Sequence, residues 1–150
     1  MQMFAIAPAS LKLFWFIPLV MIPVAVAAGL LVITLMSART ARFEVSPDGL
    51  RLRGDFYGRF IPADRLVASA ARRVEFSTAP DLQPRRRTWG TGMPGYQAGW
   101  FRLANGERAL LYLTDRSRAV YVPTTEGYGL LLSPSDPDRF LDAIRSSTAQ

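Results

Sequence analysis

The sequence predicts a mainly β domain that ends in a C-terminal helix and follows one N-terminal transmembrane helix. Three observations lead to this fold class: a long uncharged apolar run near the N-terminus, short β-like segments separated by turn residues, and a capped amphipathic segment near the C-terminus. The 150 residues suffice for one domain of ordinary size beside the apolar run, but not for two large ones. We therefore expect an N-terminal flank at 1–12, a transmembrane helix at 13–36 and a folded domain at 40–147.

The apolar run extends from Leu13 to Met36 and contains 24 residues without a charge. As a helix rising about 1.5 Å per residue it spans roughly 36 Å, which crosses a bilayer with some tilt. Lys12 and the aromatic cluster Phe14–Phe16 lie where the membrane interface accommodates such side chains. A cleaved signal peptide and a buried core helix are the alternatives. The run exceeds the usual signal-peptide core of about 7–15 residues, and no small-residue cleavage site follows it.

The basic residues beside the apolar run predict its orientation. The N-terminal side offers Lys12 and the α-amino group, whereas the C-terminal side offers Arg39, Arg42, Arg51 and Arg53. Because basic residues favour the cytoplasmic side of a membrane, we expect the folded domain in the cytoplasm.

The first β-like pair lies directly after the apolar run and predicts a hairpin around a loop at Ser46–Gly49. One face is then apolar and the other charged, as in a sheet that covers a core on one side. The pairing that achieves this is Phe43 with Leu52, Val45 with Leu50, Glu44 with Arg51, and Arg42 with Arg53.

A second hairpin is predicted around Asn105-Gly106, a dipeptide that favours a two-residue type I′ turn with positive φ at both residues. This turn places Phe101 opposite Leu110 and Trp100 opposite Leu111, and brings Arg102 diagonally to Glu107.

The remaining segments predict an antiparallel meander and a terminal helix. Short strands are expected at Arg59–Pro62, Val67–Phe76, Arg118–Thr124 and Leu130–Ser133, and a long loop at Asp81–Gly99. Asp136 has the position of an N-cap, followed by Pro137 at the first helical position. The apolar stripe of this helix consists of Phe140, Leu141 and Ile144.

The composition excludes several kinds of chemistry. The chain contains no Cys and no His, so that disulfides, thiolate nucleophiles, histidine bases and Cys/His metal sites are excluded. We expect no cofactor and no metal. The 18 Lys and Arg residues outnumber the 12 Asp and Glu residues, and the net charge of +6 favours anionic partners.

Two basic groups are candidate sites for anionic lipid headgroups. The first combines basic and aromatic residues of the expected loop: Arg85, Arg86, Arg87, Trp89 and Tyr96. The second lies on the first two expected strands: Arg42, Arg51 and Arg53. The alternative for both groups is that their arginines are ordinary solvated surface charges without a binding role. In the second group, Glu44 is also expected to neutralise Arg51. Since no acidic residue lies between Asp81 and Trp100, we expect the first group to contribute more to binding.

Gly90, Gly92 and Gly95 match by letter the glycine pattern of dinucleotide-binding folds. That pattern must follow a strand and open a helix. Here Arg85–Arg87 precedes it, and Pro94 and a β-like segment follow. Nucleotide binding of this kind is therefore not expected, and we interpret the glycines as residues that shape a loop.

Six segments in a fixed order resemble the bacterial pleckstrin-homology-like domain family of small membrane-anchored proteins: FEVSPDGLRLRG, YGRFIP, GYQAGWFRL, ALLYLTD, AVYVPT and LLLSPSDPDRFL. The resemblance covers about residues 40–147. It implies a pleckstrin-homology-like barrel of two near-orthogonal antiparallel sheets, closed at one end by the C-terminal helix. Eukaryotic pleckstrin-homology domains often bind phosphoinositides through a basic motif on the first two strands. Arg42, Arg51 and Arg53 look similar in spacing, although Arg replaces the leading Lys and Glu44 intervenes.

We therefore expect a single-pass protein of the bacterial inner membrane with a non-catalytic binding or adaptor domain. Its expected partners are a protein or anionic membrane lipids, and not nucleic acid, because the arginines are scattered over several strands. The alternative function is an enzyme acting on a lipid or cell-envelope substrate. It requires a pocket in which carboxylates such as Asp55, Asp64 or Asp81 converge.

The first prediction concerns the anchor. If the segment Leu13–Met36 spans the bilayer uncleaved, the protein stays in the membrane pellet after carbonate extraction and keeps Met1 or Gln2 at its N-terminus. Fractionation followed by N-terminal sequencing measures both properties. Release into the soluble fraction with a new N-terminus near Thr40 would identify a signal peptide instead.

Overall fold

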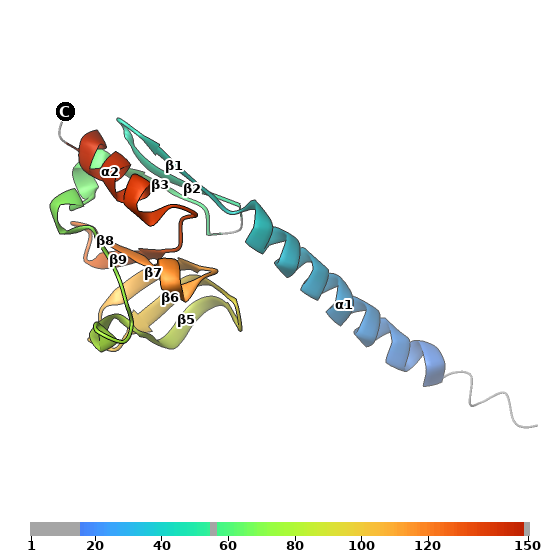
Figure 1. Ribbon diagram of the computed structural model, residues 1–150. Helices are drawn as coiled ribbons and strands as arrows, with labels where there is room; N and C mark the ends of the chain where they lie inside the picture. The colour runs from blue at the N-terminus through green and yellow to red at the C-terminus, as the bar shows by residue number, and fades with distance from the viewer. Residues whose placement is uncertain (1–15, 55–56, 149–150) are drawn as a thin grey trace, which may run out of the picture. The chain divides into compact units, whose positions relative to one another are not determined.

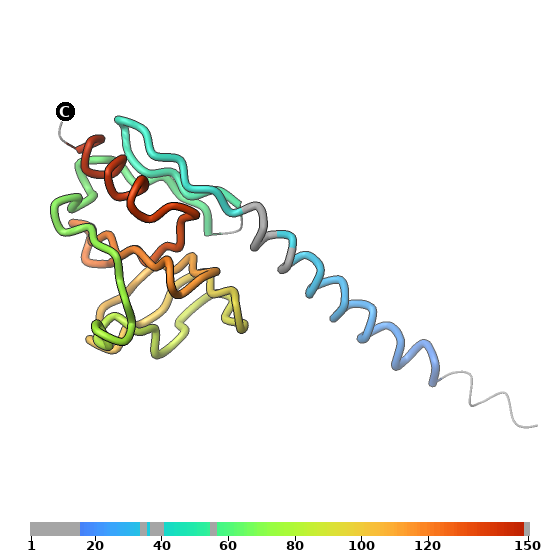
Figure 2. Tube along the Cα trace, in the orientation of Figure 1, coloured from blue at the N-terminus to red at the C-terminus, as the bar shows by residue number. Residues whose placement is uncertain are grey.

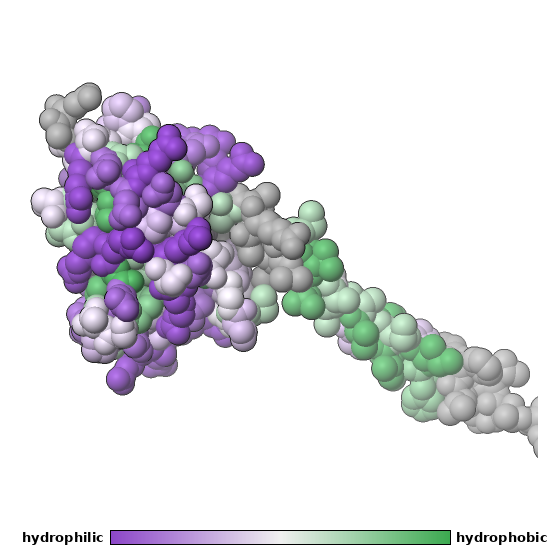
Figure 3. Space-filling view, in the orientation of Figure 1, coloured by the Kyte–Doolittle hydropathy of each residue, from purple (hydrophilic) through white to green (hydrophobic). Residues whose placement is uncertain are grey.

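The computed structural model describes residues 16–54 and 57–148, and the chain divides into two units, 1–36 and 37–150 (Figure 1). Helix α1 extends over Phe16–Thr40. Most of it belongs to the first unit, and it ends four residues after Met36, the end expected for the transmembrane helix. Its described side chains are exposed, and Figure 3 shows a predominantly hydrophobic surface along it. Such a helix is typical of a membrane span or a signal sequence. The expected interface residues Lys12, Phe14 and Trp15, like the flank 1–12, lie outside the described residues.

The second unit contains two β-sheets and a C-terminal helix, α2, at Pro137–Ser147. The smaller sheet has the order β1-β2-β3, with strands at Arg42–Ser46, Gly49–Arg53 and Phe60–Pro62. The larger sheet has the order β4-β8-β9-β7-β6-β5. In chain order, its strands are β4 Arg72–Arg73, β5 Pro84–Met93, β6 Tyr96–Leu103, β7 Arg108–Leu113, β8 Val120–Pro123 and β9 Tyr128–Leu132. The predicted fold class is confirmed, although the two sheets form a sandwich rather than a closed barrel.

The register predicted for the first hairpin is confirmed. Phe43 pairs with Leu52 and Glu44 with Arg51, and the apolar partners face the core. The turn is tighter than expected, because Ser46 and Gly49 also pair and leave Pro47 and Asp48 between them.

The ion pair expected across this hairpin forms differently. Glu44 Oε2 lies 3.2 Å from Nε of Arg53, the diagonal neighbour, whereas Arg51 stacks on Phe60 with Cζ 5.3 Å from the ring centroid. A side chain on one face of a sheet can contact either the residue directly opposite or its diagonal neighbour, and Glu44 contacts the diagonal one. The expected neutralisation of Arg51 by Glu44 is wrong.

The register predicted for the second hairpin is wrong by one residue. Trp100 pairs with Leu110 and Phe101 with Ala109. Gly106 has φ +86°, whereas Asn105 has no positive φ, so that Ala104–Gly106 form a three-residue loop instead of a type I′ turn. The slip matters because each residue shift moves side chains to the opposite face of a sheet.

The long loop predicted at Asp81–Gly99 is also wrong, since most of it forms β5 and the start of β6. Glycine makes this pairing possible, because the two backbones approach closely. A Cβ atom at Gly90 would lie 2.3 Å from the carbonyl oxygen of Ala98, and one at Gly99 would lie 2.5 Å from that of Trp89. The charged residues of β5 are compatible with a strand because β5 is the edge of the sheet.

The meander predicted for the last strands is wrong as well. β9 lies between β7 and β8, parallel to β7 and antiparallel to β8. Its residues Leu130, Leu131 and Leu132 are all fully buried, which explains why an unbroken leucine run takes a central position. The strand expected at Val67–Phe76 is reduced to β4, after a 3₁₀ turn at Ala68–Ala70.

Hydrophobic clusters cover both faces of the larger sheet. The first cluster joins this sheet to β1–β3 and α2, and includes Leu50, Ile61, Tyr112, Leu130 and Ile144. The second lies under the connection from β4 to β5, which Figure 2 shows in light green, and includes Val74, Leu82, Phe101 and Leu131. Both clusters lie wholly within the second unit, so that it has its own core.

The predicted start and apolar stripe of α2 are confirmed. Oδ1 of Asp136 accepts a hydrogen bond of 3.1 Å from the backbone N–H of Arg139, and Pro137 occupies the first turn. Phe140, Leu141 and Ile144 are buried against the first cluster.

The second prediction concerns this packing. Ile144→Ala removes a side chain that is 0% exposed, and is expected to lower the free energy of unfolding by about 3 kcal/mol. Urea unfolding of residues 37–150 measures the change. Asp142→Ala, on the exposed side of α2, is the control and should change stability by no more than about 0.5 kcal/mol. Equal effects of the two substitutions would contradict the packing.

Candidate functional site: a basic and aromatic groove

Two bulges in the edge strand β5 determine where its arginines point. The pairing of β5 with β6 shifts between Pro84 and Arg86 and again between Arg87 and Trp89. Arg87 pairs with Phe101, which belongs to the second cluster, whereas Trp89 pairs with Trp100, which packs against the first. Since paired residues share a face, Arg87 and Trp89 lie on opposite faces of the sheet.

The face of Trp89 carries a groove of about 470 Å³ lined by Tyr57, Gly58, Arg59, Trp89 and Trp100. We call it the Trp89 groove. Trp89 is 70% exposed, the highest value among the large apolar side chains that the structure describes outside α1. The described lining residues include no carboxylate and contribute one guanidinium group and three aromatic rings.

Trp100, one of the residues that line this groove, contacts two cations. Cζ of Arg59 lies 5.3 Å from the ring centroid, and Cζ of Arg108 lies 5.0 Å from it. The Tyr128 ring packs edge-on against Trp100 with a centroid separation of 5.0 Å. Burial raises the pKa of Tyr128, while a hydrogen bond from Arg59 opposes the shift and one to Glu126 adds to it.

A neighbouring hollow of about 410 Å³ shares Gly58 and Arg59 with the Trp89 groove and is also lined by Arg51, Arg53 and Phe60. Arg59 therefore lies between Trp89, from the first predicted group, and Arg51 and Arg53, from the second. Sequence reasoning missed Arg59 as a site residue. The available signal was its position in the segment YGRFIP, between Tyr57 and the β3 strand.

The predicted site residues are distributed over several places. Arg86 pairs with Arg102 on the face of Trp89, whereas Arg85 and Arg87 line a hollow on the other face. Tyr96 is 6% exposed and belongs to the first cluster, so its ring is not available to enter a headgroup region as expected. Arg42 pairs with Arg53 at the open end of the first hairpin.

The arginines differ in whether they form ion pairs within the domain. Within 16–54 and 57–148, four form ion pairs: Arg53 with Glu44, Arg65 with Glu126, Arg73 with Asp138, and Arg118 with Asp115. Hydrogen bonds of Asp115 with the side chain and backbone of Ser117 lower its pKa, and Arg118 adds to this. By contrast, Arg85, Arg86 and Arg87 are exposed and form no ion pair with any described residue. The segment Arg85–Arg87 therefore presents three consecutive exposed positive charges that no described acidic side chain neutralises.

The carboxylates named for an enzymatic alternative do not form a described cluster. Asp64 lies in the 3₁₀ turn Ala63–Arg65 and Asp81 in the turn Pro80–Leu82, and both are exposed. Asp55 lies outside the described residues. Among the residues with a described position, no group of three acidic side chains is close enough to hold a metal ion. Gly90 and Gly92 lie in β5 and are followed by another strand, which excludes the helix that a dinucleotide fingerprint requires.

A two-sheet sandwich with a C-terminal helix and a basic, aromatic surface groove defines a small binding domain of pleckstrin-homology type. The family model described as the bacterial PH domain matches residues 41–148, and the chain belongs to that family. Domains of this kind are generally binding or adaptor modules and are typically non-catalytic. No curated protein and no solved structure matches the chain.

Proposed function

We propose that this protein is a membrane-anchored, non-catalytic binding module whose PH domain engages anionic lipid headgroups at the Trp89 groove. The observation that supports this most directly is the groove itself. It combines a largely exposed Trp89 with Arg59 and Trp100, and it is continuous with the hollow that contains Arg51 and Arg53.

The chemistry of the groove suits an anionic membrane surface. Guanidinium groups form paired hydrogen bonds with phosphate, and each basic residue near an anionic surface contributes about 1 kcal/mol. Tryptophan prefers the interface, where its ring is buried and its N–H reaches polar groups. Arg86 and Arg102 on the same sheet face extend the positive charge beyond the groove.

The proposed location follows from α1 and the flanking charges. As an uncleaved helix, α1 holds the domain at the bacterial inner membrane, and Arg42, Arg51 and Arg53 favour a cytoplasmic domain. A domain on that side faces the anionic cytoplasmic leaflet, which its net positive charge matches.

The third prediction concerns this topology. A reporter that fluoresces only in the cytoplasm is expected to be bright when fused after Gln150, and a phosphatase active only in the periplasm is expected to be inactive there. Paired fusions measured in intact cells test the orientation. The reverse pair of results would overturn both the cytoplasmic location and contact with the inner leaflet.

The fourth prediction concerns lipid binding by residues 37–150, the unit with its own core. The double variant Arg86→Ala/Trp89→Ala is expected to weaken cosedimentation with vesicles that contain anionic phosphatidylglycerol. The loss combines about 1 kcal/mol for the charge with about 1–2 kcal/mol for the ring, which is roughly 30- to 150-fold in affinity. High salt should weaken the electrostatic part.

Two matched variants sharpen this experiment. Arg85→Ala/Arg87→Ala removes two charges from the opposite face and is expected to weaken binding less than the Arg86 and Trp89 variant. The triple variant Arg42→Ala/Arg51→Ala/Arg53→Ala is also expected to have a smaller effect, because Phe60 and Glu44 already engage two of these arginines. Equal binding to neutral and anionic vesicles would reject the lipid function.

A protein partner is the second candidate, and the free edge of β5 favours it. β5 pairs with β6 on one side and ends the order of the described sheet on the other. An extended acidic peptide could add to this edge by backbone hydrogen bonds while Arg85–Arg87 attract its carboxylates. Loss of lipid selectivity in the vesicle experiment would favour this candidate.

A further inference from the structure

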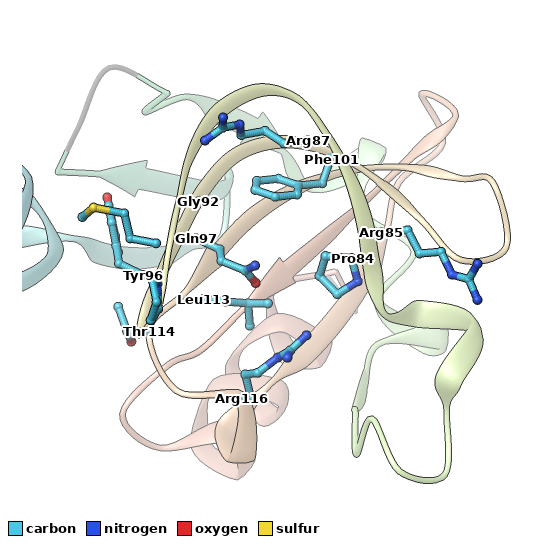
Figure 4. Close-up of a pocket in the computed structure, with 13 residues that line it drawn as sticks. Pro84, Arg85, Arg87, Gly92, Tyr96, Gln97, Phe101, Leu113, Thr114 and Arg116 are labelled. Carbon is cyan, nitrogen blue, oxygen red and sulfur yellow. The ribbon is translucent and has the colours of Figure 1, made fainter.

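Another hollow, of about 490 Å³, lies on the other face of the β5–β6 hairpin, where Arg87 points (Figure 4). We call it the Arg87 hollow. The residues that give it its chemical character are Arg85, Arg87, Arg116, Gln97, Phe101 and Leu113. Its volume lies in the range of about 300–1,000 Å³ that is typical of small-molecule sites.

Three arginines give the Arg87 hollow a strong positive charge. Arg85 and Arg87 come from β5, and Arg116 comes from the 3₁₀ turn Arg116–Arg118 after β7. The Phe76 ring supports Arg116, with Cζ 5.0 Å from the ring centroid. No carboxylate is among the lining residues, and none of the three arginines forms an ion pair within the described parts of the chain.

Apolar side chains form the inner surface of the same hollow. Phe101 is 4% exposed and Leu113 is 2% exposed, and both belong to the second hydrophobic cluster. The polar side chains of Gln97 and Thr114 also line the hollow (Figure 4). A ligand that matches this arrangement has an anionic group for the arginines and an apolar part for the Phe101 ring.

Gly92 keeps the hollow open. A Cβ atom at this position would lie 3.6 Å from Cζ of Phe101 and 3.7 Å from Nη1 of Arg87, which is ordinary contact distance. The first carbon of a side chain therefore fits, but further atoms would enter the space beside Arg87 and Phe101. Part of the glycine-rich segment that resembled a nucleotide fingerprint thus has a different use, as one wall of this hollow.

A larger hollow near the start of α2 is lined by both positive and negative side chains, unlike the Arg87 hollow. It measures about 940 Å³ and is lined by Arg42, Arg118 and Arg139, but also by the carboxylates of Glu44, Asp115 and Asp136. Asp115 already pairs with Arg118, and Asp136 caps α2. The Arg87 hollow is therefore the better candidate for an anionic ligand.

We propose that the Arg87 hollow binds a small organic phosphate with a flat or apolar body. A phosphate monoester carries about −1.5 to −2 charges at neutral pH, and its oxygens accept paired hydrogen bonds from a guanidinium group such as that of Arg87, while the other arginines of the hollow add to the positive charge. The apolar body packs against Phe101. The phosphate belongs either to a soluble metabolite or to a lipid headgroup.

This site is distinct from the Trp89 groove, because the two bulges of β5 place Arg87 and Trp89 on opposite faces. The triplet Arg85–Arg87 therefore serves two surfaces. Failure at one site leaves the other intact, since Arg86→Ala tests only the face of Trp89 and Arg87→Ala tests only the hollow.

The test uses the full chain in phosphatidylcholine nanodiscs and 1-naphthyl phosphate as the probe, measured by equilibrium dialysis against empty nanodiscs. Saturable binding of one probe per chain is expected. Inorganic phosphate, which lacks the ring, and 1-naphthol, which lacks the charge, are each expected to bind at least about tenfold more weakly, because each makes only half of the contacts.

Matched variants on neighbouring positions locate the probe. Arg87→Ala is expected to reduce its affinity about tenfold, and Gly92→Val by at least as much, because the valine methyl groups would occupy the space beside Arg87 and Phe101. Arg86→Ala and Thr91→Val make similar changes on the opposite face and should leave the affinity unchanged. Near-UV circular dichroism checks that each variant is folded, and Arg87→Gln replaces Arg87→Ala if the latter is not.

Nanodiscs that contain phosphatidic acid distinguish the two sources of phosphate. Displacement of the probe by this lipid identifies a headgroup site, and undisturbed binding identifies a site for a soluble phosphate; both results support the proposal. It is overturned if no saturable binding occurs, if 1-naphthol binds as well as its phosphate, if Gly92→Val binds normally, or if Arg86→Ala weakens binding as much as Arg87→Ala.

Discussion

The burial of β9 in the middle of the larger sheet is the constraint on which the rest of the domain depends. Leu130 and Leu132 belong to the cluster shared with β1–β3 and α2, whereas Leu131 belongs to the cluster under the connection from β4 to β5. One strand therefore contributes to both cores. Because the side chains of these three leucines are 0% exposed, both sheet faces must be covered, which explains why the small sheet, α2 and the β4–β5 connection lie where they do.

The edge of this sheet differs from its buried centre, because the edge strand β5 carries exposed arginines and two bulges. Charge on an edge protects a sheet against unwanted pairing, and bulges redirect side chains. In this protein the same features divide one basic segment between two surfaces. The Trp89 groove, lined by Arg59 and three aromatic rings, lies on one face, and the Arg87 hollow, lined by three arginines and Phe101, lies on the other. The buried central strands thus support an edge strand that presents side chains on both faces of the sheet.

Aromatic contacts explain how so many arginines are accommodated with few acidic partners. Arg51, Arg59, Arg72, Arg108 and Arg116 each lie over a ring, at 5.0–5.4 Å from the centroid. Such contacts orient a guanidinium group without cancelling its charge, whereas an ion pair does cancel it. The domain therefore keeps a positive surface that is also structurally ordered.

The sequence by itself determined the features that depend on neighbours along the chain: the apolar helix, the register of the first hairpin, the N-cap and stripe of α2, and the family resemblance. Only the tertiary structure decided the insertion of β9 between β7 and β8, the strand at 84–93, and the meeting of Arg59 with Trp89. The physical reason is that these features depend on burial and backbone approach between distant segments. Glycines at 90 and 99 suggest a loop until the facing backbone is known, and the turn at 104–106 shifts a register that local pattern leaves open.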